Sequence, residues 1–484
     1  MQKIDFIQNP LYEMNDIGIA KLFMDSFKDE LIFCNDTADW YWWNGKFWTK
    51  DAKEGGKRYE MIKELAEYSN KKIQQSDISK EIKDALTSVF RKLNTKYYRD
   101  SVLKDAQSIC PVSASIFDNN KYLFNCQNGT FDIERGIFRD FEKSDYLTEM
   151  SNVYFDKKAK CPRFKQFLEE VLETEDKINY LLKIAAYCLT ADTSYECFFV
   201  LYGNKTRNGK STFTSTLEYL LGSYAKILRD ETITQKSFNV GGNNATPEIA
   251  RLRNARLALV NEITPGMMLN ISLIKSMTGG DTLLARHLYK EDFEYKPKFK
   301  LLINTNDLPK MSEDSIFKSR RIQLLCFNKV IDEDKQDVDL KDKLKNEISG
   351  IFNLILPYYN LLKKEGWQQP KETQETIEKY RYTSNNILIF EKECLFKAPD
   401  LYEKVSDIYQ FYVKWAEENG YNTLSKKNFK DKMEQLGAVF TEKISKKNRQ
   451  NCYENTYWML GFSHFKPKNE QIELTPINDE PLPF

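Results

Sequence analysis

The spacing of apolar and polar positions divides the first part of the chain into helical and extended stretches. Between residues 15 and 27 apolar side chains recur at helical spacing, and Asn15 can cap the helix. Between residues 38 and 50 an Asn-Gly pair separates two aromatic runs, which predicts a tight β-hairpin. Helical spacing returns at 56–108, and residues 121–138 predict short strands joined by turns.

From about residue 163 the pattern becomes that of an α/β domain. Residues 163–190 have helical spacing, and the apolar run 197–202 is typical of a buried strand. Further buried-type strands are expected at 257–260, 301–303 and 322–327, with helical patterns between the first two. This alternation predicts a largely parallel sheet.

A small separate unit is expected near the C-terminus. Ser425 can cap a helix that ends at Gly437, and two strands are expected at 438–444 and 456–462. A helix followed by paired strands is the layout of a winged helix. The chain as a whole is then expected to comprise an N-terminal α+β region (1–110), a segment with a helical end (111–195), an α/β core (196–335), a helical connector (336–400), the winged-helix-like unit (401–465) and a flexible tail (466–484).

Composition narrows the class of protein. The 484 residues include 72 Lys+Arg and 71 Asp+Glu, so the net charge of +1 gives no overall attraction to nucleic acid, and basic patches must be sought locally. A hydrophobic content of 41% indicates a chain that folds around cores rather than a disordered or fibrous one. No run approaches the ~20 apolar residues of a membrane span and no export signal begins the chain, so we expect a cytoplasmic protein without a membrane partner.

The spacing of the cysteines and histidines in the sequence differs from that of a structural metal site. The nine cysteines form no CxxC pair, and the chain has only two histidines. A structural zinc site or a disulfide framework is therefore not expected, and reduced thiols inside the cores are the simpler interpretation. The aromatic residues of the 38–50 hairpin, which include four of the seven tryptophans, are expected to form a small core, with a stacking platform for bases as the alternative.

The strongest chemical signal follows the 197–202 strand. The segment GNKTRNGKST stands between that strand and a helical pattern, which is the order of a phosphate-binding loop. Such a loop binds a triphosphate through backbone N–H groups, a lysine on the β- and γ-phosphates and a hydroxyl on Mg²⁺. The residues expected to bind ATP, with Ser211 on Mg²⁺, are Gly203, Asn204, Asn208, Gly209, Lys210, Ser211 and Thr212.

The spacing of this loop departs from the usual pattern. Five residues rather than four separate Gly203 from Gly209. The loop is therefore either one residue longer than usual or turned at Asn204, since asparagine tolerates a left-handed backbone.

Hydrolysis also needs a carboxylate near the γ-phosphate, at the end of a neighbouring strand. Glu262 follows the 257–260 strand and is expected to activate the attacking water and to share Mg²⁺ with Ser211. After the 301–303 strand an amide could sense the γ-phosphate, with Asn306 as the first candidate and Asn304 as the second. A plain turn is the alternative for both, because asparagine is common in turns.

Two arginines, Arg320 and Arg321, precede the 322–327 strand. A guanidinium at this place could stabilise charge on a transferring phosphoryl group. The two arginines by themselves establish nothing, and their assignment depends on the family that the whole set of motifs indicates.

The ordered set of phosphate loop, Asn261-Glu262, the stretch 275–309 and the KSRRI segment resembles the superfamily 3 helicases. It is most similar to the helicase portion of phage and plasmid primase-helicases and of the poxvirus primase-helicase, over roughly residues 110–465. The resemblance implies an AAA+-like ATPase core that assembles as a ring, usually a hexamer, and moves along single-stranded DNA with 3′ to 5′ polarity. It also implies Arg321, or alternatively Arg320, as the finger presented to a neighbouring subunit.

The same family places a β-hairpin before the sensor strand, inside the ring. Here the hairpin would span about residues 286–300, with Lys290 near its tip as the first DNA-binding candidate and Tyr289 and Lys296 as weaker ones. The polymerising primase domain of longer family members is not expected in this chain, because the first 110 residues hold no histidine and no paired acidic ligands. A separate primase or polymerase is thus a candidate partner.

A local basic patch lies in the C-terminal unit. Between residues 425 and 450 eight Lys+Arg stand against three Asp+Glu, a net charge of +5. A solvated lysine-rich helix is the alternative to a duplex DNA contact. The residues expected to contact DNA there are Lys426, Lys427, Lys430, Lys446, Lys447 and Arg449.

The predicted function is that of an ATP-dependent DNA helicase of phage, plasmid or mobile-element replication. Two other functions fit the same motifs. One is an origin-binding initiator that uses ATP as a switch, and the other is a ring ATPase that remodels protein.

Overall fold

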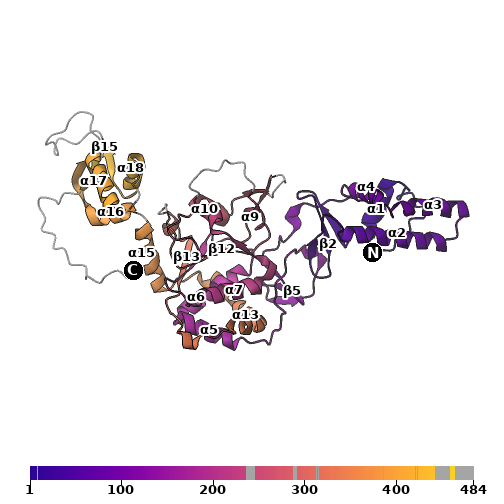
Figure 1. Cartoon of the computed structure of the whole chain (residues 1–484), viewed down its shortest axis with the longest axis horizontal. Coiled ribbons are helices and arrows are strands. Elements are labelled where there is room, and N and C mark those ends of the chain that lie inside the picture. Colours follow the sequence, from indigo (N-terminus) through magenta and orange to yellow (C-terminus); the bar gives the residue numbers. More distant parts are fainter. Residues whose placement is uncertain are drawn as a thin grey trace. The chain divides into compact units, whose positions relative to one another are not determined.

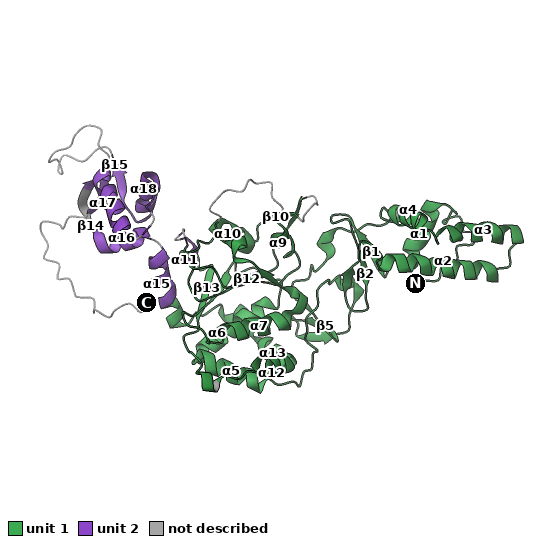
Figure 2. Ribbon diagram, viewed as in Figure 1, with its two compact units in different colours: residues 1–310, 318–374 green, residues 311–317, 375–484 purple. Residues whose placement is uncertain are grey.

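The computed structural model describes all residues except 8, 236–245, 287–291, 312, 314, 385, 420, 422, 442–457 and 464–484. The chain divides into two units, the first formed by residues 1–310 and 318–374 and the second by residues 311–317 and 375–484 (Figure 2). Each unit is described by itself. The six segments expected from the sequence stay a prediction.

The N-terminal part of the first unit combines helices with a three-stranded antiparallel sheet in the order β1-β2-β3 (Figure 1). Asn15 caps the first helix by accepting a hydrogen bond from the backbone N–H of Gly18 at 2.8 Å, as predicted. The elements are α1 (Asp16–Phe27), β1 (Leu31–Cys34), β2 (Asp39–Trp43), β3 (Trp48–Lys50), α2 (Lys57–Gln75), α3 (Lys80–Lys92) and α4 (Lys96–Ala106).

The aromatic hairpin formed by β2 and β3 is confirmed, but its turn lies one residue later than predicted. Gly45 and Lys46 occupy the tip, and Gly45 has a φ of +95°, which favours glycine. Asn44 stands before the tip and accepts a hydrogen bond from the backbone N–H of Lys46 at 2.9 Å. Trp40 and Trp48 are buried, so these two rings are core residues, as the simpler interpretation expected.

The next part of the chain carries a second small antiparallel sheet, which the 121–138 pattern predicted. The helical stretch expected at 163–190 is two helices, separated where Glu173 has a left-handed φ of +64°. The elements are η1 (Ala114–Ile116), β4 (Leu123–Cys126), β5 (Gly129–Asp132), β6 (Ile137–Arg139), η2 (Lys143–Asp145), α5 (Pro162–Leu172) and α6 (Glu175–Cys188).

A five-stranded sheet in the order β13-β7-β12-β9-β8 forms the centre of the first unit. All neighbouring strands run parallel, which confirms the predicted sheet, and the carboxyl ends of the strands therefore share one edge. The strand β8 was not predicted, because only Leu228 of its four residues is buried. The strands are β7 (Phe198–Tyr202), β8 (Ala225–Leu228), β9 (Leu257–Asn261), β12 (Lys300–Thr305) and β13 (Ile322–Cys326).

Helices before, within and after this sheet pack into one hydrophobic core with it. The helices between the strands are α7 (Lys210–Leu221), η3 (Gly222–Tyr224), α8 (Asp230–Ile233), α9 (Pro247–Ala250) and α10 (Ile271–Thr278), and an antiparallel hairpin is formed by β10 (Leu283–Arg286) and β11 (Asp292–Tyr295). The helices after the sheet, where helical structure was predicted, are η4 (Glu333–Lys335), α12 (Leu340–Asn346), α13 (Ile348–Ile355) and α14 (Pro357–Glu365).

The second unit has its own core, in which Phe390, Tyr412 and Phe429 are buried. Ser425 caps α18 as predicted, since its hydroxyl accepts a hydrogen bond from the N–H of Asn428 at 3.3 Å. The antiparallel sheet has the order β14-β16-β15, and β14 was not predicted. The elements are α11 (Ser315–Lys318), α15 (Lys371–Ser384), α16 (Asn386–Cys394), β14 (Phe396–Lys404), α17 (Val405–Glu418), α18 (Lys426–Gln435), β15 (Val439–Thr441) and β16 (Trp458–Ser463).

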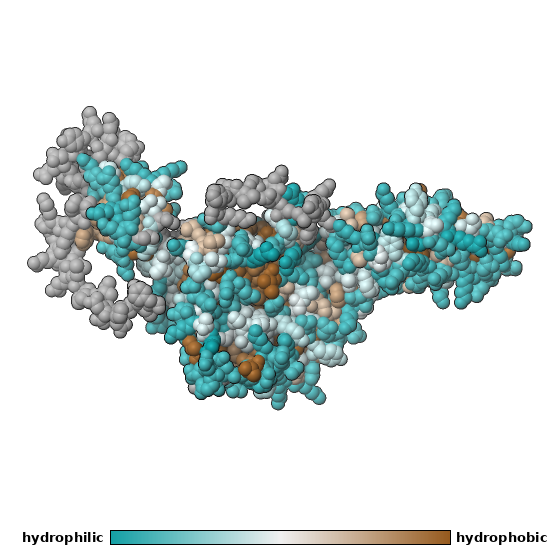
Figure 3. All heavy atoms as spheres, in the orientation of Figure 1, coloured by the Kyte–Doolittle hydropathy of each residue, from teal (hydrophilic) through white to brown (hydrophobic). Residues whose placement is uncertain are grey.

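The described surface seen in Figure 3 is mostly hydrophilic, in keeping with a mean hydropathy of −0.60. Apolar side chains are instead gathered in the cores of the units. Among the helices that the structure describes, none combines the length and the apolar character needed to cross a bilayer.

Candidate nucleotide-binding site

The predicted phosphate loop joins the carboxyl end of β7 to the start of α7, as the sequence indicated. Its left-handed residues are Arg207, with φ of +61°, and Gly209, with φ of +86°, whereas Asn204 is not left-handed. The turn proposed at Asn204 is therefore wrong, and the loop is of the longer kind. The side chain of Asn208 shapes the loop from inside, because its amide donates to the carbonyl of Lys205 at 2.6 Å.

Gly209 is required by space as well as by its backbone angle. A Cβ at this position would lie 2.6 Å from Cγ1 of Val171 and 3.1 Å from Cε2 of Phe167. Both side chains belong to α5, so this helix packs directly against the loop. A larger residue would push the loop away from α5 and displace the N–H groups at the start of α7.

Lys210 points into the centre of the loop. Its ammonium donates to the carbonyl of Gly203 and to the side-chain oxygen of Asn306, each at 2.9 Å. The residue is only 3% exposed. Burial lowers the pKa of Lys210 to about 8, and the nearby carboxylate of Glu262 acts in the opposite direction.

The two candidate sensor residues are placed differently. Asn306 lies just beyond β12 and contacts Lys210 through the hydrogen bond described above, while Asn304 is buried within the strand at 4% exposure. The carbonyl of Asn304 accepts a hydrogen bond from the N–H of Glu262 at 2.7 Å. Of the two, Asn306 is thus the residue brought to the loop lysine.

Glu262 stands at the same edge of the sheet as the phosphate loop, directly after β9. Its side chain is exposed, and its backbone has a left-handed φ of +59°. A left-handed non-glycine residue costs about 1–3 kcal/mol and persists where its surroundings hold it. The hydrogen bond from its N–H to the carbonyl of Asn304 supplies that restraint on the backbone.

The hydroxyl candidates Ser211 and Thr212 lie in the first turn of α7, Ser211 exposed and Thr212 half-buried. Because the first N–H groups of a helix have no partner within it, this end attracts anions. No group of three or more histidine, cysteine or acidic side chains that could hold a metal is present among the described residues. A metal ion here would therefore be held by Ser211, Glu262, water and phosphate oxygens.

A cavity of about 210 Å³ opens beside the loop, between α5 and residues 331–341. Gly209 and Thr212 form its wall on the loop side, and Phe167 faces it from α5. The backbone N–H of Ile331 donates to the carbonyl of Arg207 at 2.9 Å, which ties the opposite wall to the loop. The pattern of the sequence gave no indication of this cavity, because its walls come from three segments far apart in the chain.

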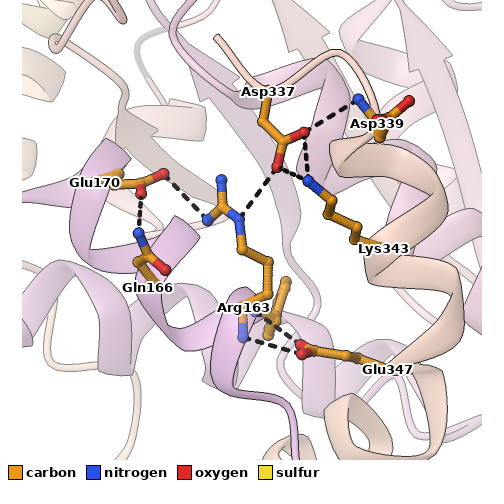
Figure 4. Close-up of polar contacts among 8 residues, drawn as sticks. Arg163, Gln166, Glu170, Asp337, Asp339, Lys343 and Glu347 are labelled. Atoms are coloured by element: carbon orange, nitrogen blue, oxygen red, sulfur yellow. Dashed lines mark hydrogen bonds and ion pairs between the residues drawn. The ribbon is translucent and has the colours of Figure 1, made fainter. Parts of the chain in front are cut away.

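Ion pairs connect the two walls of this cavity (Figure 4). The guanidinium of Arg163 lies 3.2 Å from the carboxylate of Glu170 and 3.6 Å from that of Asp337. Lys343 contacts the same Asp337 at 2.8 Å, and Glu347 accepts a hydrogen bond from the backbone N–H of Arg163 at 3.0 Å. The segment 331–341 is thereby held against α5.

The two arginines lie at the opposite edge of the sheet from the phosphate loop, because β13 is parallel to β7 and they precede it. Five strand residues at about 3.3 Å each separate the two edges by roughly 16 Å. Arg321 forms an ion pair with Glu196 at 2.7 Å and bonds Thr278 at 3.2 Å. Arg320 is exposed and left-handed, with φ of +57°. Neither arginine belongs to the nucleotide site of its own chain.

The predicted DNA-binding residues are only partly described. The hairpin is formed by residues 283–295, earlier than the expected 286–300, and Lys296 is exposed just after it. Lys290 and Tyr289 lie outside the described residues. In α18 Lys426 and Lys427 are exposed, and Lys430 lies 5.0 Å from the ring centre of Phe440, while the remaining candidates, Lys446, Lys447 and Arg449, also fall outside the described residues.

Three protein-family models match separate segments of the chain. "D5 N terminal like" matches residues 20–173, a "Family of unknown function (DUF5906)" matches residues 201–321, and "Poxvirus D5 protein-like" matches residues 382–463. In the sequence, the first segment therefore precedes the strands of the sheet that carries the phosphate loop, and the third segment follows them.

The curated relatives are viral proteins with helicase names. "Putative helicase L207/L206" of Acanthamoeba polyphaga mimivirus is 29% identical over 458 residues, which are 86% of this chain and 47% of that protein. "Putative helicase 022R" of Frog virus 3 is 26% identical over 283 residues, 54% of this chain and 29% of that protein. The chain spans about half the length, or less, of these relatives.

Among solved structures, the NrS-1 C terminal region is similar at 13% identity, with a TM-score of 0.48 and coverage of 88% of this chain and 86% of that one. The D5-type segments that precede and follow the phosphate-loop domain in the sequence, together with the helicase-named viral relatives, make this chain similar to D5-like primase-helicases.

Proposed function

We propose that the chain is an ATP-driven DNA helicase of viral or mobile-element replication. One observation carries the proposal. Lys210, Asn306 and Glu262 come from three different strand ends and meet at the edge where the phosphate loop lies. A lysine, an amide and a carboxylate around a phosphate loop are the groups that nucleotide hydrolysis requires.

Each residue then has a separate task. Lys210 exchanges its two oxygen acceptors for the β- and γ-phosphates, and the N–H groups at the start of α7 receive the remaining phosphate charge. The Ser211 hydroxyl and Glu262 are the groups that would hold Mg²⁺, which neutralises charge on the phosphate oxygens. The carboxylate of Glu262 accepts the proton of the attacking water, and Asn306 orients the γ-phosphate or that water.

The cavity between α5 and residues 331–341 is the proposed place of the nucleoside. It adjoins Gly209 and Thr212, the end of the loop from which the sugar and base leave the phosphates. The Arg163 ion pairs, which are between one-fifth and two-fifths exposed, keep this wall in place. Partly exposed pairs contribute little to global stability, so we assign them this positioning role.

Ring assembly is proposed from the position of the two arginines. A guanidinium at the amino edge of the sheet cannot serve the loop of its own chain, but it can serve a neighbour whose loop faces that edge. The Arg321–Glu196 pair is partly exposed, so its rupture costs about 1 kcal/mol or less and leaves Arg321 available as the finger. Arg320, exposed beside it, is the alternative.

DNA contacts are proposed at the β10–β11 hairpin and in the second unit, whose helices and antiparallel sheet are the elements of a winged helix. Lys426 and Lys427 occupy the first turn of α18, where the helix dipole disfavours cations by about 0.3–1 kcal/mol each. Their position is therefore poor for stability and suited to binding phosphate. The hairpin tip, with Lys290, is proposed as the contact inside a hexameric ring.

The deciding experiment is the ATPase rate of the full chain with and without single-stranded DNA, together with its native mass. Stimulation by DNA of arbitrary sequence and a ring-sized mass support the helicase. An ATPase rate that does not change when DNA is added favours a protein-remodelling ATPase, and unwinding restricted to one DNA sequence favours an origin-binding initiator. We further propose that the protein acts in the cytoplasm of a host cell, with priming supplied by a primase or polymerase on another chain or elsewhere in a longer one.

A further inference from the structure

A groove outside the nucleotide site has the side chains of a single-strand binding surface. It consists of two cavities, of about 530 and 430 Å³, which adjoin because both are lined by Tyr41, Lys50, Arg253 and Asn254. Each lies in the range of about 300–1,000 Å³ that is typical of ligand sites. Such a space is too small for a base-paired duplex and has room for unpaired nucleotides.

Hydrogen bonds hold the walls of this groove together. The first wall is the turn between β1 and β2, and the N–H of Asn35 in that turn donates to the carbonyl of Val112 at 3.1 Å. Lys298, just before β12, donates to the carbonyls of Phe117 at 3.1 Å and Asp118 at 2.8 Å. Since Phe117 lines the groove, these bonds fix the N-terminal wall to the central sheet.

The opposite wall comes from the central part of the unit. Arg253 and Asn254 follow α9, and Asp292 and Phe293 belong to β11, the second strand of the hairpin. The groove therefore begins at the Asp292 end of β11, where this strand pairs with Arg286 in the hairpin for which DNA contacts are proposed, and runs past Arg253 toward Arg251 and Lys226.

The carboxylates that line the larger cavity of the groove each have a partner within the chain. The carboxylate of Asp39 is paired with Lys50 at 2.6 Å, and that of Asp292 with Arg286 at 3.5 Å. Asp36 accepts hydrogen bonds from the Ser113 hydroxyl at 2.8 Å and the Ala114 N–H at 2.7 Å. The acidic side chains are thus engaged within the chain.

Arg253 differs from these residues because no carboxylate partner is present for it in the part of the chain that the structure describes. Its guanidinium lies 5.3 Å from the ring centre of Phe293. Lys53, exposed at the rim, likewise has no described ion pair. These two cations are therefore available to bind phosphate oxygens of a nucleic acid backbone.

Aromatic rings stand beside these cations. Phe293 and Tyr41 are both half-buried, and the Tyr41 ring is supported from behind by Phe117, with ring centres 4.4 Å apart. A supported ring and an arginine plane offer flat surfaces on which any base can stack. Available cations beside aromatic rings are the combination by which proteins hold single strands without reading sequence.

We propose that this groove binds single-stranded DNA independently of sequence, with Arg253 and Lys53 on phosphates and Phe293 and Tyr41 against bases. It is a contact separate from the hairpin tip and from the second unit. The proposal rests on the proposed function only in that the protein must bind single strands at all.

The test measures binding of a fluorescent oligothymidylate to the full chain, by anisotropy at several salt concentrations. Arg253→Gln should weaken binding about tenfold or more and should reduce the slope of log affinity against log salt by about 0.7, the value for one phosphate contact on a single strand. Lys53→Gln, at an exposed side chain, should reduce the slope by a similar amount without disturbing packing. Phe293→Leu should weaken binding and leave the slope unchanged.

Arg91→Gln is the matched control, because Arg91 is an exposed arginine of α3 outside the groove. ATPase turnover without DNA should be unchanged in all four variants. Ultraviolet crosslinking of the wild-type complex should label the peptide that contains Tyr41 or Phe293. If wild type binds tightly and the groove variants bind as well as Arg91→Gln, the proposal that this groove binds single strands is overturned, and the helicase proposal is unaffected. A wild-type protein that binds no single strand at low salt overturns both.

Discussion

The pH dependence of nucleotide binding is the sharpest consequence of the way Lys210 is buried. The residue is 3% exposed, and its ammonium contacts two neutral oxygens and has a pKa of about 8. A polyphosphate binds the charged form of this lysine. Binding therefore stabilises the ammonium and raises its pKa, so affinity is full below pH 8 and is lost as the pH rises above it.

The size of the effect follows from the pKa. With a pKa of about 8, roughly nine-tenths of Lys210 is charged at pH 7 and roughly one-tenth at pH 9. The apparent Kd for a nucleotide should then rise about tenfold between these values, which is about 1.4 kcal/mol. Phosphate groups, whose last pKa is near 6, are roughly nine-tenths ionised at pH 7 and more so above it, so their ionisation changes the Kd by only about a tenth over this range.

The assay is titration calorimetry with a non-hydrolysable ATP analogue at pH 7, 8 and 9, each in buffers of different ionisation enthalpy. The buffer series measures proton uptake, which should be roughly 0.9 per nucleotide at pH 9 and roughly 0.1 at pH 7. Lys210→Arg is the matched control. Its guanidinium stays charged throughout, so its affinity should not fall with pH, whatever its absolute value.

Two results would refute this reasoning about Lys210. One is saturable binding by wild type whose Kd is constant from pH 7 to 9. The other is an equal fall in the Lys210→Arg variant, which would assign the titration to another group. Either result would remove the lowered pKa of Lys210 as the cause, while leaving the position of the phosphate loop untouched.

Three other experiments test the remaining residues proposed for hydrolysis, ring assembly and DNA binding. Glu262→Gln should keep nucleotide affinity and lower turnover by about 10²–10⁴, because an amide cannot accept the proton of water; a collapse of affinity would mean that Glu262 acts as a metal ligand more than as a base. Arg321→Ala and Lys210→Ala should each be inactive, and mixing them should restore part of the turnover; no recovery in rings that exchange subunits contradicts a trans finger. The double variant Lys426→Gln/Lys427→Gln should reduce the slope of log affinity for duplex DNA against log salt by about 0.9 per lost contact, without lowering Tm. An unchanged slope would mean that both lysines are solvated surface residues that do not contact DNA.

The parts of the fold that the sequence predicted are those determined by neighbouring residues. The strand β7, the phosphate loop and α7 follow one another without interruption, so local apolar spacing and the loop motif were enough to locate them. The caps of α1 and α18 were also predicted, because Asn15 and Ser425 bond backbone groups three residues away.

The parts that were missed depend on distant residues. The edge strand β8 buries only Leu228, so it has no apolar run, and β14 contains Pro399 and charged residues, which weaken any strand pattern. The cavity wall at 331–341 is set by ion pairs to α5, and Arg163 and Asp337 are 174 positions apart in the sequence. No local periodicity reports a contact of that kind.

The residues whose positions are hardest to predict from the sequence are cations inside the core. They also explain why the amino and carboxyl edges of the central sheet have different contacts. Arg256 and Lys300 are each at most 2% exposed, at the amino ends of β9 and β12. Their side chains donate to the carbonyls of Leu189 and Thr190, just beyond the end of α6. Cations are favourable near the carboxyl end of a helix, which offsets part of the cost of burying them.

This arrangement assigns a different role to each edge of the central sheet. At the amino edge, Arg256 and Lys300 bind backbone carbonyls of the preceding segments, and Lys298 fastens the groove wall by donating to the carbonyl of Phe117. At the carboxyl edge of the same strands, Asn306 accepts a hydrogen bond from Lys210, and the exposed carboxylate of Glu262 lies near enough to raise the pKa of that lysine. Because β9 and β12 pair side by side in parallel, Glu262 and Asn306, which are proposed for ATP, follow the same two strands that Arg253 and Lys298 of the proposed groove precede.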